Sequence, residues 1–479
     1  MTLLSRATLA GVPATVAAPR GRTVGGVGIV HFGPGAFHRA HQAAYVDSLL
    51  DHDPRWGIAA VSMRSRGTIE ALAAQDGLYT LAIRDAEPGL RVIDAHRRFL
   101  GPEDGVATRA LLADPATRLV TSTVTEKGYC LAADGTLDMG HPDIVHDLAR
   151  PIVPRSVVGW IVTGLDARRI AGRAPFVPMP CDNLASNGAK LHAALVAFAR
   201  AGDPALADWI DGEVRVPSTM VDSITPAADD ALYADVAAAL GVTDRAPVQR
   251  EAFVQWVIED IGATDGPDLA AVGATVTSDV AGYEKAKLRI LNGAHSTLAY
   301  AGLLRGHVSV AEAMRDADLA GFVDAMIRYD IMPMLPAVPG FDLDGYRAAV
   351  LRRFTNPAIV HRLDQIAQDG SQKLPYRLGD TLLANRAAGR LPRHVIMALG
   401  CWVAFLIKRH AAGIAIVDPA AESLLAAVAG VTPRRAMAAL IERGLGIPGA
   451  VQADRDARDA LESAAVAAFR GEISFGAAA

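Results

Sequence analysis

Cysteine is scarce in this chain of 479 residues: Cys130, Cys181 and Cys401 are far apart and form no CxxC pair. Isolated thiols argue against a disulfide framework and are typical of the reducing cytoplasm, so we expect a cytoplasmic protein. No cluster of cysteine, histidine and carboxylate has metal-ligand spacing in the sequence. We therefore expect chemistry without a bound metal ion.

Long apolar runs and an excess of positive charge are also lacking. The longest apolar run, 395–407, is too short to span a bilayer and indicates a buried helix. The formal net charge is −5, which gives no basic surface for nucleic acid. Residues 1–19 carry one basic residue and a weak, alanine-rich stretch, which we interpret as a surface extension before the first strand. We expect neither a membrane nor a nucleic acid as partner.

Hydrophobic periodicity indicates two domains. Apolar runs rich in β-branched residues at 27–33, 57–63 and 118–125 predict buried strands, and helical patterns follow the first two. Strands that alternate with helices are typical of a doubly wound parallel sheet of Rossmann type. From about residue 283 the spacing is almost wholly helical. We predict a dinucleotide-binding domain over 1–280 and a mostly α-helical domain for substrate and catalysis over 281–479.

A glycine-rich turn follows the first predicted strand. Its residues are Gly33, Pro34, Gly35, Ala36, Phe37 and His38. The first glycine permits a tight turn, the second lets the backbone approach a pyrophosphate, and the amides of the next helix point at the phosphates. The third glycine of the full fingerprint is absent, and His38 stands in its place. We predict a dinucleotide site at this turn.

The segment after the second strand separates NAD from NADP. An acid there normally binds the ribose 2′-hydroxyl, but this chain has Arg64 and Arg66 instead. Arginines are able to accept a 2′-phosphate, and they are equally compatible with a solvated surface. We expect NAD, with NADP possible.

Lys287, Asn292 and His295 form the pattern K-x4-N-x2-H inside an apolar helical segment. At about 100° per residue of an α-helix, Asn292 lies about 140° and His295 about 80° round from Lys287, so all three share one face. A hydrogen-bonded surface stripe would explain the pattern. A catalytic site also would, because a lysine can act as base when burial lowers its pKa, and asparagine amides can hold an oxyanion. His38 and His41 have the i,i+3 spacing of metal ligands, but their place beside the phosphate turn argues against a metal.

Several segments in the same order resemble the mannitol dehydrogenase family, the zinc-independent long-chain polyol dehydrogenases and hexuronate reductases. The match runs along almost the whole chain. The segments are GPGAFHRAHQA (33–43), TVTEKGYC (123–130), CDN (181–183), MVD (220–222), FVQWVIED (253–260), LNG (291–293) and DGSQK (369–373).

The resemblance implies a Rossmann-type N-terminal domain and a helical C-terminal domain, with NAD as the usual cofactor and substrate in the cleft between them. It also implies roles for single residues: general base for Lys287, oxyanion site for Asn183 and Asn292, orientation of substrate hydroxyls for His295, and substrate binding for Asp222 and Lys373. This chain has Ser223 where the family usually has arginine. Arg66 and Gly67 likewise replace the acids that mannitol enzymes carry.

The substrate is left open between branches of the family. TVTEKGYC and QIAQDGSQKLPYR look more like fructuronate reductases, and Gln365 stands where mannitol enzymes tend to have arginine. Arg362 and Arg377 are candidates to pair with a uronate carboxylate. We expect D-mannonate and D-fructuronate first, with D-mannitol 2-dehydrogenase or D-arabinitol 4-dehydrogenase as the alternative. The partner is thus a small sugar alcohol or aldonate, and the protein is a monomer or a small homo-oligomer. An inactive cofactor-binding regulator is a further alternative, which retention of the lysine, asparagine and histidine disfavours.

Overall fold

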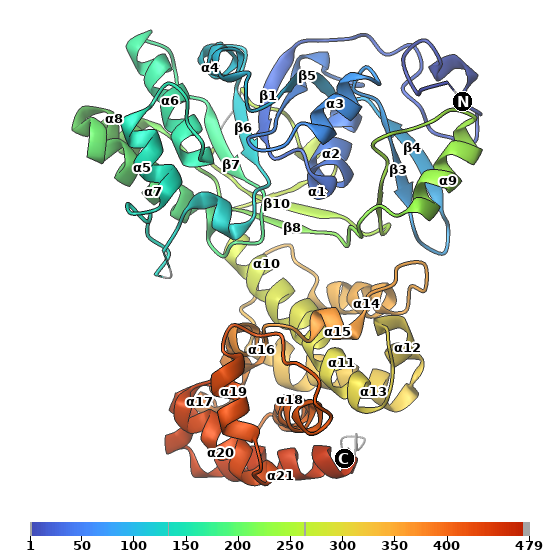
Figure 1. Ribbon diagram of the computed structural model, residues 1–479, viewed down its shortest axis with the longest axis vertical. Helices are drawn as coiled ribbons and strands as arrows, with labels where there is room; N and C mark the ends of the chain where they lie inside the picture. The colour runs from blue at the N-terminus through green and yellow to red at the C-terminus, as the bar shows by residue number, and fades with distance from the viewer. Residues whose placement is uncertain (1, 133, 263–264, 473–479) are drawn as a thin grey trace. The chain divides into compact units, whose positions relative to one another are not determined.

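The β-branched run that begins at Val27 forms the middle of a five-stranded parallel sheet in the computed structural model, which describes residues 2–132, 134–262 and 265–472. The strand order is β5-β2-β1-β6-β7, so the direction in which strands are added reverses at β1. This confirms the predicted doubly wound parallel sheet (Figure 1). The strands are β1 (Val27–Phe32), β2 (Gly57–Val61), β5 (His96–Leu100), β6 (Leu119–Ser122) and β7 (Val177–Pro180).

The chain divides into two compact units, Met1–Ala281 and Gly282–Ala479. Helices cover both faces of the parallel sheet in the first unit. Val30 and Phe32 of β1 point into a core with α4, α6, α7 and α8, whereas Ile29 points into a second core with α1, α2 and α3. The helices of this unit are α1 (Ala36–Ala40), α2 (Gln42–Leu49), α3 (Gly67–Ala73), α4 (Gly105–Ala113), α5 (Pro142–Ala149), α6 (Val157–Ile170), α7 (Asn187–Gly202), α8 (Pro204–Glu213) and α9 (Asp230–Leu240), with short 3-10 turns η1 (Leu9–Gly11), η2 (Pro54–Trp56), η3 (Glu126–Tyr129) and η4 (Ala270–Val272).

Two further three-stranded sheets complete the first unit, and the hydrophobic pattern did not predict them as sheets. One has the order β4-β3-β9 and the other the order β11-β10-β8. The first of these joins segments far apart in the chain, since Leu81 of β3 pairs with Val248 of β9. The strands are β3 (Tyr79–Ile83), β4 (Gly89–Ile93), β8 (Thr219–Asp222), β9 (Val248–Arg250), β10 (Gln255–Glu259) and β11 (Thr275–Thr277).

The segment before β1 is not the surface extension that its composition suggested. Leu4, Leu9, Val12 and Val16 are buried in a cluster with apolar residues of α9 and of strands β3 and β4. The backbone also pairs, because Leu4 N donates to the carbonyl oxygen of Thr243 at 2.8 Å. A weak run of small apolar residues therefore closes one side of the first unit.

The second unit is helical, as predicted, and its described residues contain no strand longer than an isolated bridge. Its elements are α10 (Val280–Ala286, shared with the first unit), η5 (Lys287–Asn292), α11 (Gly293–Leu304), α12 (Val310–Arg315), α13 (Ala317–Ala325), η6 (Met326–Ile331), η7 (Met332–Met334), α14 (Leu343–Phe354), α15 (Leu363–Ile366), α16 (Gly370–Leu374), η8 (Pro375–Gly379), α17 (Asp380–Ala387), α18 (Arg393–Ala411), α19 (Ala421–Val428), α20 (Pro433–Arg443), η9 (Gly449–Ala453) and α21 (Arg455–Arg470). Of these, η5, η6 and η8 are π-helical turns.

Helix α18 is the centre of this unit and contains the long apolar run at 395–407. It packs against α11 and α21, and its residues from Val395 to Ile407 are buried almost without interruption. Among the residues that the structure describes, no helix is both long and apolar enough to cross a membrane. Gly400 marks the closest approach to α21, because a Cβ there would lie 2.7 Å from the backbone carbon of Ala464.

We expect Gly400→Ala to destabilise the protein by about 1–3 kcal/mol, since the two helix backbones must move apart to admit the methyl group. The matched control is Gly321→Ala in the interior of α13, where nothing lies within 4 Å of the added carbon. That change should stabilise by about 0.5–1 kcal/mol through helix propensity. Calorimetric unfolding of both variants measures the pair. If both substitutions changed the stability by the same amount and in the same direction, this would contradict the close packing of α18 on α21.

Candidate active site

The turn after β1 has no room for a side chain at Gly33. Its φ is +90°, and a Cβ would lie 2.6 Å from the carbonyl oxygen of Thr123, which follows β6. Thr123 Oγ1 also donates to the Gly33 carbonyl at 2.7 Å. The ends of β1 and β6 thus meet where the strand order reverses, which is where open α/β sheets bind ligands. The position of a Gly33 side chain is thus taken by the Thr123 carbonyl, so this glycine is required for the contact between the two strand ends.

The helix after this turn offers main-chain amides and no imidazole. Gly35 is the exposed N-cap of α1, whose first amides lack intrahelical partners. The side chain of His38 instead lies in the core, stacked on His31 with ring centroids 3.4 Å apart. His41 points elsewhere, with Nε2 2.9 Å from the Gln255 carbonyl oxygen. The two histidines with metal-ligand spacing therefore diverge.

His31, His38 and His96 form a buried imidazole cluster beneath the glycine turn. Nε2 of His38 lies 3.1 Å from Nε2 of His96, and Nδ1 of His31 lies 2.7 Å from Thr121 Oγ1. Burial lowers the pKa of His31 and of His96 to about 3, and it lowers the pKa of His38 well below its ordinary value. The cluster is therefore neutral at physiological pH.

The two arginines after β2 are exposed and ion-paired. Arg64 pairs with Asp143 at 3.1 Å. Arg66 pairs with Glu70 at 2.9 Å and with Glu103 at 2.5 Å. Each guanidinium that could meet a 2′-phosphate thus already has a carboxylate beside it.

The CDN segment follows β7, and a buried tyrosine holds its turn. The Tyr129 hydroxyl donates to Asp182 and lies 2.8 Å from Ser122 Oγ at the end of β6. Asp182 also accepts from the backbone amide of Leu184 at 2.9 Å. These bonds set the backbone that presents Asn183, which is exposed.

Asp222 ends β8 and is buried, opposite Gln255 of β10. The next residue, Ser223, departs from the arginine of the family. Its hydroxyl donates to the carbonyl of Phe253 at 3.1 Å, so this position now ties two segments of the small sheet together.

Lys287 begins a π-helical turn that runs to Asn292, so the expectation of regular α-helical spacing is wrong over these six residues. A π-turn closes on the residue five positions along rather than four. Asn292, five residues after Lys287, is consequently brought nearly above it, closer than the α-helical projection placed it. Such turns occur often at functional sites.

His295 lies one turn further, in α11, and is buried against Phe354 with ring centroids 4.5 Å apart. Burial first, and then nearby His361, Arg353 and Arg377, lower the pKa of His295 well below its ordinary value. Its Nε2 is buried and has no hydrogen-bond partner among the described residues. Buried polar groups normally have a partner, so a ligand hydroxyl is a fitting one.

Arg377 reaches the same helix from a second π-turn, η8. Its Nη1 donates to Ser296 Oγ at 3.0 Å and to the Asn292 carbonyl oxygen at 3.4 Å. It forms no ion pair with a carboxylate of the described residues, and burial lowers the pKa of its guanidinium. A largely buried cation without an acid beside it is a strong binder of an incoming anion.

The other two predicted cations are already engaged. Lys373 Nζ donates to the Gln368 carbonyl at 2.9 Å and pairs with Asp369 at 3.4 Å. Arg362 is half exposed and forms a two-bond pair with Asp364. Of the two arginines predicted to bind substrate, Arg377 is therefore the one that contacts the K-x4-N-x2-H segment.

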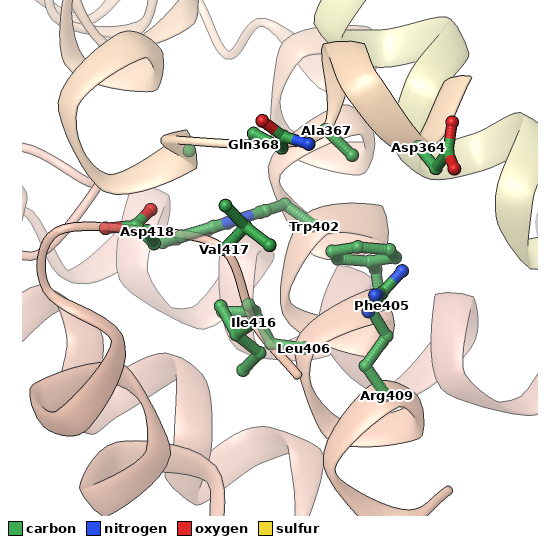
Figure 2. A pocket seen from close by; sticks show the side chains of 11 residues that line it. Asp364, Ala367, Gln368, Trp402, Phe405, Leu406, Arg409, Ile416, Val417 and Asp418 are labelled. Carbon is green, nitrogen blue, oxygen red and sulfur yellow. The ribbon is translucent and has the colours of Figure 1, made fainter. Parts of the chain in front are cut away.

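The cavity behind the DGSQK segment is too small for a sugar. Its volume is about 20 Å³, enough for roughly one water. Figure 2 shows Trp402, Val417 and Asp418 closing it. Asp418 also accepts from the Ser371 backbone amide at 2.9 Å. Asp418 therefore supports the DGSQK segment, and the small cavity behind this segment is no substrate site.

Sequence reasoning missed the supporting residues of the site. Ser296 directly follows His295, and Tyr129 lies inside the quoted TVTEKGYC segment. Tyr129 was therefore inside a motif and Ser296 directly adjoined one, so a local signal was present for both. His361, whose ring meets that of His295 edge-on at 5.3 Å, had no such signal, because only the fold brings it close.

Comparison with known families matches both units. A profile described as "Mannitol dehydrogenase Rossmann domain" matches residues 27–269, and one described as "Mannitol dehydrogenase C-terminal domain" matches residues 279–445. Together they cover most of the chain.

Three relatives illustrate the similarity. The D-mannonate oxidoreductase of Escherichia coli (strain K12) is 41% identical over 403 residues, 82% of this chain and 82% of that protein. The polyol:NADP oxidoreductase of Gluconobacter oxydans (strain 621H) is 39% identical over 382 residues, 78% and 79% of the two chains. The solved Pseudomonas fluorescens mannitol 2-dehydrogenase, a ternary complex with NAD and D-mannitol, has a TM-score of 0.82 and 35% identity over 97% and 96% of the chains.

The neutral imidazole cluster makes stability depend on pH. The unfolded pKa of histidine is about 6.5 and the folded pKa of His96 is about 3, so its contribution is complete above about pH 6.5 and is lost as pH falls toward 3. Between these two pKa values, each such histidine adds about 1.4 kcal/mol per pH unit to the slope of the unfolding free energy against pH. We expect His96→Gln to reduce the slope measured by urea unfolding between pH 5.5 and 4.5. The exposed His410→Gln is the control, and an unchanged slope in His96→Gln would refute the burial argument.

Proposed function

The chain belongs to the mannitol dehydrogenase family of polyol and sugar-acid dehydrogenases, and from this premise we propose that it interconverts D-mannonate and D-fructuronate with a nicotinamide cofactor. The similarity to the D-mannonate oxidoreductase of Escherichia coli supports this choice. The observation that carries it is Arg377, a largely buried guanidinium that bonds to the segment of Asn292 and His295 and pairs with no described carboxylate. An aldonate supplies a carboxylate, whereas a neutral polyol does not.

Lys287 is the proposed general base. It takes the proton from the substrate hydroxyl, and the Asn292 amide, brought above it by the π-turn, donates to the oxygen on which charge develops. His295 is neutral, and its free Nε2 holds a neighbouring hydroxyl. In this scheme the developing alkoxide is held by amide donors, and no metal ion takes part.

The first unit supplies the proposed contacts to the cofactor and part of the remaining contacts to substrate. The Gly33–Gly35 turn and the first amides of α1 hold the pyrophosphate, with Pro34, Ala36, Phe37 and the main chain of His38 forming the rest of the turn. NAD or NADP, when bound, accepts the hydride. Asn183 is assigned to the oxyanion, and Asp222 and Lys373 are assigned to substrate hydroxyls, as the resemblance implies. Arg362 is retained only as a secondary candidate, because Asp364 already engages it.

A polyol dehydrogenase acting on D-mannitol or D-arabinitol is the second candidate. The solved relative with D-mannitol bound supports it, since its fold covers almost all of this chain. The two candidates differ in whether the substrate carries a negative charge.

Lys287→Ala should lower kcat by about 10²–10⁴-fold, because general base catalysis contributes that much. Cofactor binding, followed by fluorescence of NADH, should change little. Lys285→Ala is the matched control, two residues earlier and exposed. A Lys287→Ala enzyme with near-normal turnover would exclude this lysine as the base.

The proposed role of Arg377 predicts that its substitution lowers kcat/KM for acid substrates more than for neutral polyols. We expect purified enzyme to use D-mannonate with a higher kcat/KM than D-mannitol or D-arabinitol. Arg377→Gln should lower kcat/KM for D-mannonate by roughly tenfold to hundredfold, the effect of losing a charged hydrogen bond. Loss of the bond to Ser296 alone would affect all three substrates equally, so the ratio between them separates the two roles. A ratio that does not change would place the carboxylate elsewhere.

Cofactor choice should be looser than in relatives with an acid after β2. We expect NAD to be preferred, with measurable NADP activity, because Arg66 attracts a 2′-phosphate while Glu70 and Glu103 partly neutralise it. Arg66→Glu should lower the NADP-to-NAD ratio of kcat/KM by roughly tenfold or more, and Glu103→Gln should raise it. Arg455→Glu makes the same charge change on an exposed arginine of the second unit. No NADP activity in the wild type and no change of ratio would show that Arg66 does not lie at the ribose.

A further inference from the structure

One side-chain cluster outside the proposed chemistry has the composition of a metal site. The thiol of Cys130, a ring nitrogen of His141 and a carboxylate oxygen of Asp143 lie within 4.8 Å of one another. Cys130 follows the η3 turn after β6, and the other two residues are the N-cap and the first turn of α5. We propose that these three side chains bind one zinc-class divalent cation, with a solvent molecule in the fourth position.

The donor set favours zinc over magnesium or calcium. Thiolate, imidazole and carboxylate are the zinc ligands of proteins, whereas the two alkaline-earth ions require oxygen alone. At zinc bond lengths and tetrahedral angles, the ligand atoms lie about 3.5 Å apart. The three side chains therefore need to close by about 1 Å, which small side-chain rotations supply. Cys130 is buried, while His141 and Asp143 are partly exposed and leave the site open to solvent.

Two of the three proposed ligands have a partner with which the ion competes. His141 Nδ1 accepts from the backbone amide of Asp143 at 3.2 Å. A metal on either ring nitrogen ends this bond, because a neutral imidazole has one nitrogen lone pair to give. Asp143 also pairs with Arg64 at 3.1 Å, and a carboxylate bound to the ion gives up part of that attraction.

The thiol must lose its proton when the metal–sulfur bond forms, and that proton goes to solvent. Because a thiolate replaces a thiol when the ion binds, metal affinity should rise with pH. The spacing in the sequence did not reveal this site, because only the fold brings Cys130 to the start of α5.

The test uses the full chain after exhaustive chelation, titrated with Co²⁺ as a coloured substitute for zinc. We expect one ion per chain and a near-ultraviolet band from thiolate-to-cobalt charge transfer. Cys130→Ser should abolish the band and weaken binding at least tenfold. Cys401→Ser, another buried cysteine, is the control and should change neither. His141→Asn should also weaken binding at least tenfold while keeping the helix cap, since asparagine caps helices well.

Two further variants should change the affinity for the metal ion in opposite directions. Asp143→Asn removes a ligand and should weaken binding, whereas Arg64→Ala frees Asp143 and should strengthen it. Loss of a salt bridge alone would act in the same direction in both. A missing band, or a band that persists in Cys130→Ser, would overturn the site. Chelated enzyme that keeps its turnover supports a site apart from the chemistry. Turnover that is lost on chelation, restored by zinc and absent from Cys130→Ser would overturn that separation.

Discussion

The close approach of two strand ends is the constraint on which the parallel sheet of the first unit depends. Gly33 and Thr123 meet where the order of the parallel sheet reverses, and no side chain fits between them. His31 of β1 and His38 of α1 stack near this turn, with ring centroids 3.4 Å apart. The turn that is exposed to solvent is thus supported by a neutral, tightly stacked layer.

In the second unit the corresponding constraint is the pair of π-turns at Lys287–Asn292 and Pro375–Gly379. They pack on one another, and the Arg377 guanidinium bonds to the carbonyl of Asn292 and to Ser296. A Cβ on Gly293 would lie 3.1 Å from the Arg377 carbonyl oxygen, so little space separates the two backbones. The wider π-helical turns direct the side chains of the catalytic candidates differently from those of a regular α-helix.

The sequence sufficed for the layers of the fold and for the family, whereas the roles of the motif residues stay predictions. Apolar β-branched runs followed by helical patterns predict the parallel sheet, and continuous helical spacing predicts the second unit. The sequence did not predict the pairing of β3 with β9, because short strands far apart in the chain pair through tertiary packing. The π-helical turn at Lys287–Asn292 was not predicted either, because its residues also suit a regular α-helix. Partners of long side chains, such as Glu103 for Arg66, depend on distant segments that local pattern does not report.

The buried guanidinium of Arg377 has a consequence for how the substrate range of such a protein changes over generations. A partly buried cation without an acid beside it lowers the stability of the chain that carries it. Under the proposed role, mutation to a neutral residue would therefore relieve the fold while it erased the preference for acids. A population under weak selection for acid substrates would lose this arginine readily and drift toward neutral polyols, whereas the return path would have to cross a less stable intermediate.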